Sequence, residues 1–184
     1  LVVFGAGHVS HALMRIVGDL PWQITWVDSR QECFPATVPT NTTVHCTDDP
    51  AGDVPGLCSN AHVLILTHNH ALDYDLCQAL LKQDDVLTIG LIGPQTKAER
   101  FRKRLDHRGY TQTDIDRIRC PVGRSDIPGK RPMEVAVSIS AELLSLVASD
   151  TAEKPSKRGL SWGALKALTK EVKSGEVEVV GQKT

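Results

Sequence analysis

A glycine turn directly after the first apolar run is the feature that most constrains how this chain folds. Residues 1–4 form a continuous apolar run, Gly5-Ala6-Gly7 follows it, and residues 9–18 show the apolar spacing of a helix. Glycines at such a turn let the backbone approach a phosphate closely, and the N-terminus of the next helix attracts its charge. The first 18 residues therefore predict a strand, a phosphate-binding turn and a helix.

The chain continues as alternating strands and helices. A second apolar run ends at Asp28, which lies 21 residues after Gly7, close to where an acid that binds a ribose belongs. Further patterns predict strands over residues 43–46, 62–67 and 86–92 and helices over residues 71–82, 96–108 and 133–148. Short buried strands that alternate with helices predict an α/β fold, a Rossmann-like three-layer αβα sandwich with a mainly parallel sheet.

The turn itself leaves open whether a nucleotide is bound. Ser10 stands at the third glycine position of the dinucleotide fingerprint and is larger than that position prefers, and His8 places a side chain in the turn. A Rossmann-like domain that binds NAD(P) and one that holds no dinucleotide tightly both fit this pattern.

Local signals define the ends of the domain and of one helix. Thr96-Lys-Ala-Glu99 matches a capping box, and Gly109 suits the left-handed position after a helix.

We assign residues 1–150 to one Rossmann-like domain and residues 151–184 to a loosely attached tail with one short amphipathic helix. Because Leu1 already belongs to the first predicted strand, we expect the chain to begin partway along a longer protein.

Composition excludes several classes of protein. The 184 residues carry 21 basic and 22 acidic side chains, which is not the balance of a generic nucleic-acid binder. No apolar run approaches the roughly 18 residues of a membrane span. Five cysteines without a C-x-x-C pair favour a reducing cytoplasm. Cys33 and Cys58 fall in predicted loops, where they could relay sulfur, whereas Cys46 and Cys77 fit a core.

The near-zero net charge conceals an asymmetry along the chain. Residues 1–96 carry three basic and ten acidic side chains, a balance of −7, whereas residues 97–131 carry eleven basic and five acidic ones, a balance of +6. One interpretation is that the helix predicted over residues 96–108 has an ordinary solvated face. The other is a docking surface for an anionic ligand or an acidic partner protein.

Histidines gather where the fourth predicted strand ends. Thr67, His68, His70 and Asp73 follow that strand, and His8 belongs to the glycine turn beside it. The carboxyl ends of parallel strands form the crevice in which open α/β sheets bind ligands. These side chains could hold a metal, or a pterin or phosphate through charge-assisted hydrogen bonds. Ligand contact is favoured over a metal, because no third ligand is fixed by helical spacing and no thiol joins the group.

Two further positions belong to the same predicted edge. Gly93 ends the glycine motif that follows the fifth strand. Glu134 opens the last helix, where a carboxylate also complements the helix dipole. No nucleophile beside a base and no pair of catalytic carboxylates can be identified.

A series of motifs runs in order along residues 1–148. They are Phe4-Gly-Ala-Gly-His-Val9, Val27-Asp-Ser-Arg30, Thr67-His-Asn-His-Ala-Leu-Asp73, Ile89-Gly-Leu-Ile-Gly93 with Arg100, Phe101, Leu105 and Gly109, Cys120-Pro-Val-Gly123, and Pro132-Met-Glu-Val-Ala-Val-Ser-Ile139 with Ala141-Glu142. In this order and spacing the motifs resemble the XdhC/CoxI accessory proteins, which mature xanthine dehydrogenase and related molybdenum hydroxylases. The chain departs from the family pattern at Pro94, where Ser is usual, and at Ser10, where Gly or Ala is more common.

The resemblance implies a chaperone of the molybdenum cofactor rather than an enzyme. Such a protein binds molybdopterin, protects it while a cysteine desulfurase installs the terminal sulfur, and delivers it to apo xanthine dehydrogenase or a related enzyme. The cofactor contacts implied are Gly5, Gly7, His8, Asp28, Thr67, His68, His70, Asp73, Gly93 and Glu134. Docking of the partner enzyme is expected at Arg100, Arg102 and Arg104.

Two other functions stay open at this point. The glycine turn and Asp28 also fit an NAD(P)-dependent oxidoreductase, although no proton donor or substrate lobe is identifiable after residue 96. A nucleotide-sensing module that acts on a partner through the basic helix is the third possibility. The sequence leaves open which molybdenum enzyme is served, which form of the cofactor is carried, and whether a homodimer forms.

Overall fold

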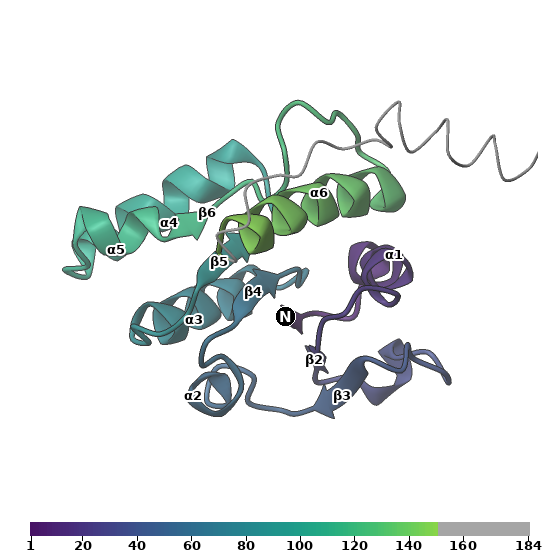
Figure 1. Ribbon diagram of the computed structural model, residues 1–184. Coiled ribbons are helices and arrows are strands. Elements are labelled where there is room, and N and C mark those ends of the chain that lie inside the picture. Colours follow the sequence, from purple (N-terminus) through teal and green to yellow (C-terminus); the bar gives the residue numbers. More distant parts are fainter. Residues whose placement is uncertain (151–184) are drawn as a thin grey trace, which may run out of the picture. The chain divides into compact units, whose positions relative to one another are not determined.

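The computed structural model describes residues 1–150 and shows strands that alternate with helices (Figure 1). The strands are β1 (Val2–Phe4), β2 (Ile24–Asp28), β3 (Thr42–Cys46), β4 (His62–Ile65), β5 (Thr88–Leu91) and β6 (Ile118–Arg119). The helices are α1 (His8–Val17), α2 (Val54–Leu57), α3 (His70–Leu81), α4 (Gln95–His107), α5 (Gln112–Asp116) and α6 (Pro132–Asp150), with a short 3-10 helix, η1 (Gln31–Cys33).

The strands form one sheet in the order β3-β2-β1-β4-β5-β6, and every pair of neighbours in it is parallel. The predicted α/β fold with a parallel sheet is therefore confirmed. The chain runs outward from β1 to β3 in one direction and from β4 to β6 in the other, so the strand order reverses between β1 and β4. A ligand crevice is expected at this switch point, outside the carboxyl ends of the strands.

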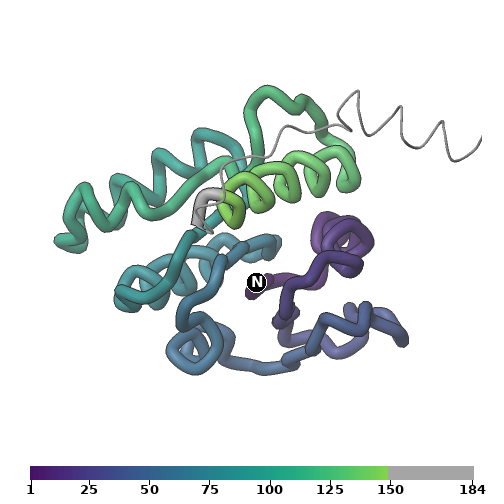
Figure 2. The backbone as a smooth tube through the Cα atoms, in the orientation of Figure 1, coloured from purple at the N-terminus to yellow at the C-terminus, as the bar shows by residue number. Residues whose placement is uncertain are grey.

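Both faces of the sheet are covered, which explains the continuous apolar runs of the strands. Val2 and Phe4 belong to a buried cluster that packs under α2, α3, α4 and α5. Val3 points to the opposite face and belongs to a cluster formed with α1, η1 and α6. Figure 2 traces α1 and α6 as the purple and green segments of the tube, and buried residues of both belong to this cluster. These two apolar clusters, one on each face of the sheet, thus hold the carboxyl ends of the strands in place.

Helix α4 corrects one local prediction. Its N-cap is Pro94, with φ −73° and ψ 165°, so the helix begins at Gln95 and no side chain caps it. Thr96 already lies inside the first turn, and the predicted capping box at Thr96 and Glu99 is wrong. A capping box does form at Thr111 and Asp114, at the start of α5.

Other boundaries agree to within a few residues. Gly109 adopts φ +86°, which confirms the predicted left-handed position after α4. The short elements α2, α5 and β6 carry too few residues to show a periodic pattern and were not predicted. The predicted tail over residues 151–184 lies outside the described residues. Within residues 1–150, no helix combines the length and the apolarity that crossing a membrane requires.

Candidate functional site

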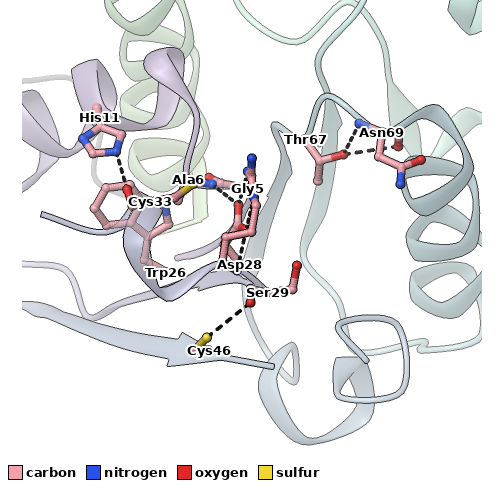
Figure 3. Close-up of polar contacts among 11 residues, drawn as sticks. Gly5, Ala6, His11, Trp26, Asp28, Ser29, Cys33, Cys46, Thr67 and Asn69 are labelled. Carbon is pink, nitrogen blue, oxygen red and sulfur yellow. Dashed lines mark hydrogen bonds and ion pairs between the residues drawn. The ribbon is translucent and has the colours of Figure 1, made fainter. Parts of the chain in front are cut away.

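Gly5 is the residue that allows the turn after β1 to form. Its φ of +103° favours glycine, and a Cβ atom there would lie 2.7 Å from the carbonyl oxygen of Leu66. Its N–H donates to the Val27 carbonyl at 2.7 Å. Its carbonyl accepts from Trp26 Nε1 at 3.0 Å (Figure 3). The turn is therefore locked between β2 and the end of β4.

Gly7 differs from Gly5, because nothing in the fold requires it. It caps α1 with φ −89°, and a Cβ atom added there would meet no atom within 4 Å. No side chain caps the helix, so the amides of its first turn point toward the open space in front of them. Absence of a side chain at Gly7 keeps this space free for a ligand.

Asp28, at the end of β2, is held by its own neighbours. One carboxylate oxygen accepts from the Ala6 N–H at 2.6 Å, and the guanidinium of Arg30 forks over both oxygens at 2.9 and 3.0 Å. Burial would raise the pKa of Asp28, but the hydrogen bonds from Arg30 and from the backbone of Ala6 outweigh it and hold that pKa below its ordinary value. Asp28 is thus an ionised anchor for the glycine turn and for Arg30.

Beside the turn, Thr67 and Asn69 shape the loop between β4 and α3 (Figure 3). The Asn69 side chain caps α3 by accepting from the N–H groups of Ala71 and Leu72. Thr67 Oγ1 accepts from the Asn69 N–H at 3.1 Å and donates to Asp73 at 2.6 Å. These bonds fix the backbone on both sides of His68.

Asp73 is completely buried and forms an ion pair with Lys97 of α4, whose side chain is 5% exposed. Lys97 Nζ lies 2.5 Å from Asp73 Oδ2 and also donates to the Ile92 carbonyl at 2.8 Å. The pair therefore connects the loop after β4, through Thr67, with the loop after β5, through Ile92. Asp73 supports the edge from beneath, and its own oxygens are turned away from solvent.

A cleft of about 630 Å³ opens at the switch point between β1 and β4; we call it the switch-point cleft. The glycine turn forms one wall, Leu66, Thr67 and His68 form another, and Arg30 and Pro132 reach it from farther along the chain. A side pocket of about 180 Å³ adjoins it and is lined by Asp28, Arg30, Thr67 and His68. The volume of the switch-point cleft is that of a site for a small molecule.

The three predicted histidines do not all converge. His8 and His68 line the switch-point cleft from opposite walls, as predicted from the strand order. His70, the first residue of α3, is exposed and lines neither this cleft nor the side pocket. A different histidine, His11, lines the cleft instead and bonds through Nε2 to the Cys33 carbonyl.

Gly93 and Glu134 lie farther along the same edge. Gly93 has φ +149° and lines a second cleft, above β5 and β6. The carboxylate of Glu134 accepts from the N–H groups of Lys130 and Arg131, so it caps the start of α6. This is the helix-terminus role that the sequence offered as an alternative to ligand contact.

The predicted docking arginines fall into two groups. Arg100 and Arg102 are exposed on α4 and have no ion-pair partner within residues 1–150. Arg104 stacks on the buried Tyr74 ring, with Cζ 3.8 Å from the ring centroid. Arg104 therefore contributes to packing between α3 and α4 as well as to the charge of the surface.

Two cysteines differ in exposure from what the sequence predicts. Cys58 is buried, and burial raises the pKa of its thiol to about 12, whereas Cys46 at the end of β3 is exposed. Cys58 follows α2 in a loop, as predicted, but its burial speaks against a relay of sulfur there. The prediction that Cys46 belongs to the core is wrong. Cys77 is buried as predicted, and Cys33 is partly exposed at the switch-point cleft.

Sequence reasoning missed two cations of this region. Arg30 belongs to the motif Val27-Asp-Ser-Arg30, but the motif alone assigns it no role, although it stands two residues after the acid of β2. Lys97 shares a helical stripe with Phe101 and Leu105, at spacings of four, and that pattern is the signal that places it inside. Within residues 1–150, no group of three or more His, Cys, Asp or Glu side chains is arranged to hold a metal ion.

Comparison with known proteins places these features in a family. The family described as the XdhC Rossmann domain matches residues 1–143. The Escherichia coli (strain K12) protein YqeB, itself uncharacterized, is 30% identical over 149 residues, which are 79% of this chain and 27% of YqeB. A crystal structure of a xanthine dehydrogenase from Bacillus halodurans is 27% identical, with a TM-score of 0.68, over 84% of this chain and 44% of that one. The chain thus spans less than half the length of either relative.

Proposed function

The chain belongs to the XdhC Rossmann-domain family, and from this premise we propose that it is an accessory protein for the maturation of xanthine dehydrogenase or a related molybdenum hydroxylase. It binds the molybdenum cofactor as cargo, holds it while a cysteine desulfurase adds the terminal sulfur, and passes it to the apo enzyme. In this proposal the chain carries the cofactor and does not turn over the substrate of the enzyme it serves.

The observation that carries the proposal is the construction of the switch-point cleft. Its walls offer the open helix terminus at Gly7, the partly exposed guanidinium of Arg30, and the imidazoles of His8 and His68. Helix termini and guanidinium groups favour phosphate, and imidazoles can donate to or accept from a heteroaromatic ring. A pterin that carries a phosphate combines both kinds of group.

Asp28 and Asp73 serve the cofactor indirectly in this proposal. Asp28 orients Arg30 and the Ala6 amide, and Asp73 orients Thr67 and Lys97. Gly5 shapes the turn that both depend on. Gly93 and Glu134 remain predicted contacts that lie beyond the wall of the switch-point cleft. His70 is exposed and lines neither this cleft nor its side pocket, so in this proposal it does not contact the cofactor.

Arg100 and Arg102 are the residues that we propose for docking of the partner enzyme. Their charges are exposed and unpaired within residues 1–150, so an acidic surface can approach them without breaking an existing contact. A reducing cytoplasm stays a prediction of the sequence, and whether a homodimer forms stays open.

NAD(P) fits the site less well than the fold alone would indicate. An NAD-binding acid accepts hydrogen bonds from the ribose hydroxyls. Here both oxygens of Asp28 already accept from Arg30, and one also accepts from Ala6. Tight binding of NADH accompanied by hydride transfer would favour an oxidoreductase over the accessory role.

Co-expression with an apo molybdenum hydroxylase tests the proposal. We expect the hydroxylase to contain sulfurated cofactor with the wild-type chain and much less with His68→Ala, while the hydroxylase stays folded in both cases. His70→Ala, on the neighbouring exposed position outside the cleft, is the matched control. Full maturation of the hydroxylase in the absence of this chain would contradict the proposal.

A further inference from the structure

Helix α6 carries most of the large apolar side chains that are exposed in the described part of the chain. Four such side chains are exposed within residues 1–150, and three of them, Met133, Val137 and Leu144, belong to α6. The fourth, Leu87, directly precedes β5. Single exposed apolar side chains are ordinary on a protein surface, whereas several on one helix mark an interaction site.

The three side chains of α6 lie on one stripe of the helix. Val137 follows Met133 by four residues and precedes Leu144 by seven, so all three project from the same side. Ala141, which is small and partly buried, lies between Val137 and Leu144 on this side. The opposite side of the helix is buried in the cluster that it shares with α1. We call Met133, Val137, Ala141 and Leu144 the α6 stripe.

The α6 stripe lacks the charges that the outer face of a surface helix normally carries. Over residues 135–145 the only charged residue is Glu142, and it is engaged elsewhere. It pairs with Arg119 of β6 at 2.9 Å and accepts from the Gly123 N–H. By contrast, the exposed positions of α4 carry several arginines. A helix that is apolar on all sides is typical of a buried helix, so we expect another surface to cover the α6 stripe.

An uncharged surface is complementary to a copy of itself. Two copies of a charged face repel each other, whereas two copies of the α6 stripe can approach without repulsion. A partner with a charged docking face would bury its own charges against this stripe without a counterion, which costs free energy. Interfaces between identical chains are also more apolar at their core than the rest of the protein surface. These arguments favour a second copy of this chain as the partner.

The spacing of the stripe suits an antiparallel pair of helices. Around a two-fold axis, a contact from residue i to residue j is repeated from j to i. With the axis beside Ala141, Val137 of each copy meets Leu144 of the other, and the small side chain at the axis lets the helices approach closely. The exposed Lys130 and Arg131, just before α6, then lie at opposite ends of the pair. A parallel pair would bring these like charges together.

The size of this contact limits its strength. From residue 132 to residue 145 the helix is about 21 Å long. A single pair of helices of that length buries less than the roughly 1,200–2,000 Å² of stable specific interfaces. The loop after β6 adds a polar rim, because Ser138 Oγ donates to the Arg124 carbonyl at 3.0 Å and holds this loop against α6. We therefore expect a dissociation constant in the micromolar range, about 1–100 µM.

We propose that the α6 stripe is the interface of a homodimer in which the α6 helices of two copies pack antiparallel. The interface adjoins the switch-point cleft, because Pro132, directly before the stripe, lines that cleft. This inference goes beyond the proposed function and requires no cofactor to be bound.

Sedimentation velocity of the 184-residue chain over a range of concentrations tests the dimer. We expect the wild type to shift from monomer to dimer, and Leu144→Glu to raise the dissociation constant about tenfold or more, because the interface would bury two unpaired carboxylates. Leu87→Glu is the matched control, since Leu87 is 49% exposed, Leu144 is 43% exposed, and Leu87 lies outside α6. A wild type that stays monomeric up to about 0.5 mM, or equal weakening by the two variants, would overturn the proposal.

Mixing two variants tests the antiparallel orientation. Val137→Glu and Leu144→Lys should each weaken self-association, but in a heterodimer of the two the introduced carboxylate and ammonium groups face each other, and the second pair of contacts is unchanged. We expect the equimolar mixture to associate more strongly than either variant alone, and this recovery also shows that both variants are folded. A mixture that associates no more strongly than its components, under conditions in which the wild type dimerises, would contradict the antiparallel pairing.

Discussion

Lys97 Nζ lies 2.5 Å from Asp73 Oδ2, and both side chains are buried between α3 and α4. Each partner reaches one further group at the carboxyl edge: Asp73 accepts from Thr67 Oγ1, and Lys97 donates to the Ile92 carbonyl. A buried charge pair is costly to desolvate and costlier to break. We interpret the pair as a brace that keeps the loops after β4 and β5 at a fixed separation.

Breaking the brace on one side should destabilise the protein strongly. We expect Lys97→Met to lower the free energy of unfolding by about 3–5 kcal/mol, because it leaves the Asp73 carboxylate buried and unpaired. Lys97→Met combined with Asp73→Asn should recover part of that loss, since neither charge is then left alone. Urea denaturation measures both. Lys103→Met, on the exposed side of α4, should change little, and equal stability of Lys97→Met and this control would contradict the brace.

The two glycines of the first turn should separate folding from binding. Gly5→Ala places a Cβ atom 2.7 Å from the Leu66 carbonyl oxygen at a φ of +103°, so we expect a loss of at least about 1–3 kcal/mol from the backbone conformation alone. Gly7→Ala meets no atom and should cost less than about 1 kcal/mol. Thermal unfolding distinguishes them. A loss of stability in Gly7→Ala as large as that in Gly5→Ala would contradict this division of roles.

Asp28 should make stability depend on pH in the acid range. Its pKa is lower in the folded chain than in the unfolded one, so the unfolded chain binds more protons and stability rises with pH there. The contribution is present above about pH 4 and is lost as pH falls through the lower pKa of the folded state. We expect Asp28→Asn to be less stable at neutral pH and to show a flatter profile at low pH. Parallel profiles of the two proteins would be inconsistent with this role.

Thiol reactivity should follow burial. Thiolate is the reactive form, and burial raises the thiol pKa of Cys58 to about 12 and raises those of Cys77 and Cys120. In the native protein at pH 8 we expect alkylation of Cys46 first and of Cys33 more slowly, with the other three protected until the chain unfolds. Peptide mass spectrometry after brief labelling identifies the sites. Early labelling of Cys77 would contradict the core as described.

Docking through α4 should depend on charge and on salt. We expect Arg100→Glu to weaken binding to an apo molybdenum hydroxylase and to lower the salt dependence of that binding. Arg15→Glu on α1 makes the same change in net charge away from α4 and serves as the control. Equal effects of the two variants would show that net charge, and not this surface, decides binding.

The sheet could be predicted from the sequence because its signals are local and redundant. The apolar run of β1, the turn at Gly5 and the acid at Asp28 each indicate the same topology, and the structure confirms it. The first residue of α4 was harder to predict. Thr96 has the sequence of an N-cap residue, but the extended backbone of Pro94 makes Pro94 the N-cap, and the helix begins at Gln95.

Side-chain destinations at the edge were harder to predict than the edge itself. Periodicity places both His68 and His70 after the fourth strand, but it does not indicate which of them lines the cleft. Asn69 caps α3, so His68 lies in the loop before the helix and lines the cleft, whereas His70 is the first residue of the helix and does not. The sequence indicates only that Asp73 is a polar residue near the edge of the sheet. Its burial is explained by its ion pair with Lys97, which lies 24 residues away in the sequence. Pairings across such a distance leave no pattern in one sequence.

Retention of molybdopterin by the purified chain is the most direct test of the central claim. The chain is mixed with cofactor released from a molybdenum enzyme, passed through a desalting column, and examined for pterin fluorescence in the protein fraction. We predict that the wild type retains pterin and that Gly7→Ala, folded to the same extent, retains much less, because its methyl group fills the space in front of α1. Loss of pterin by the wild type, under conditions in which a known carrier keeps it, would contradict the account.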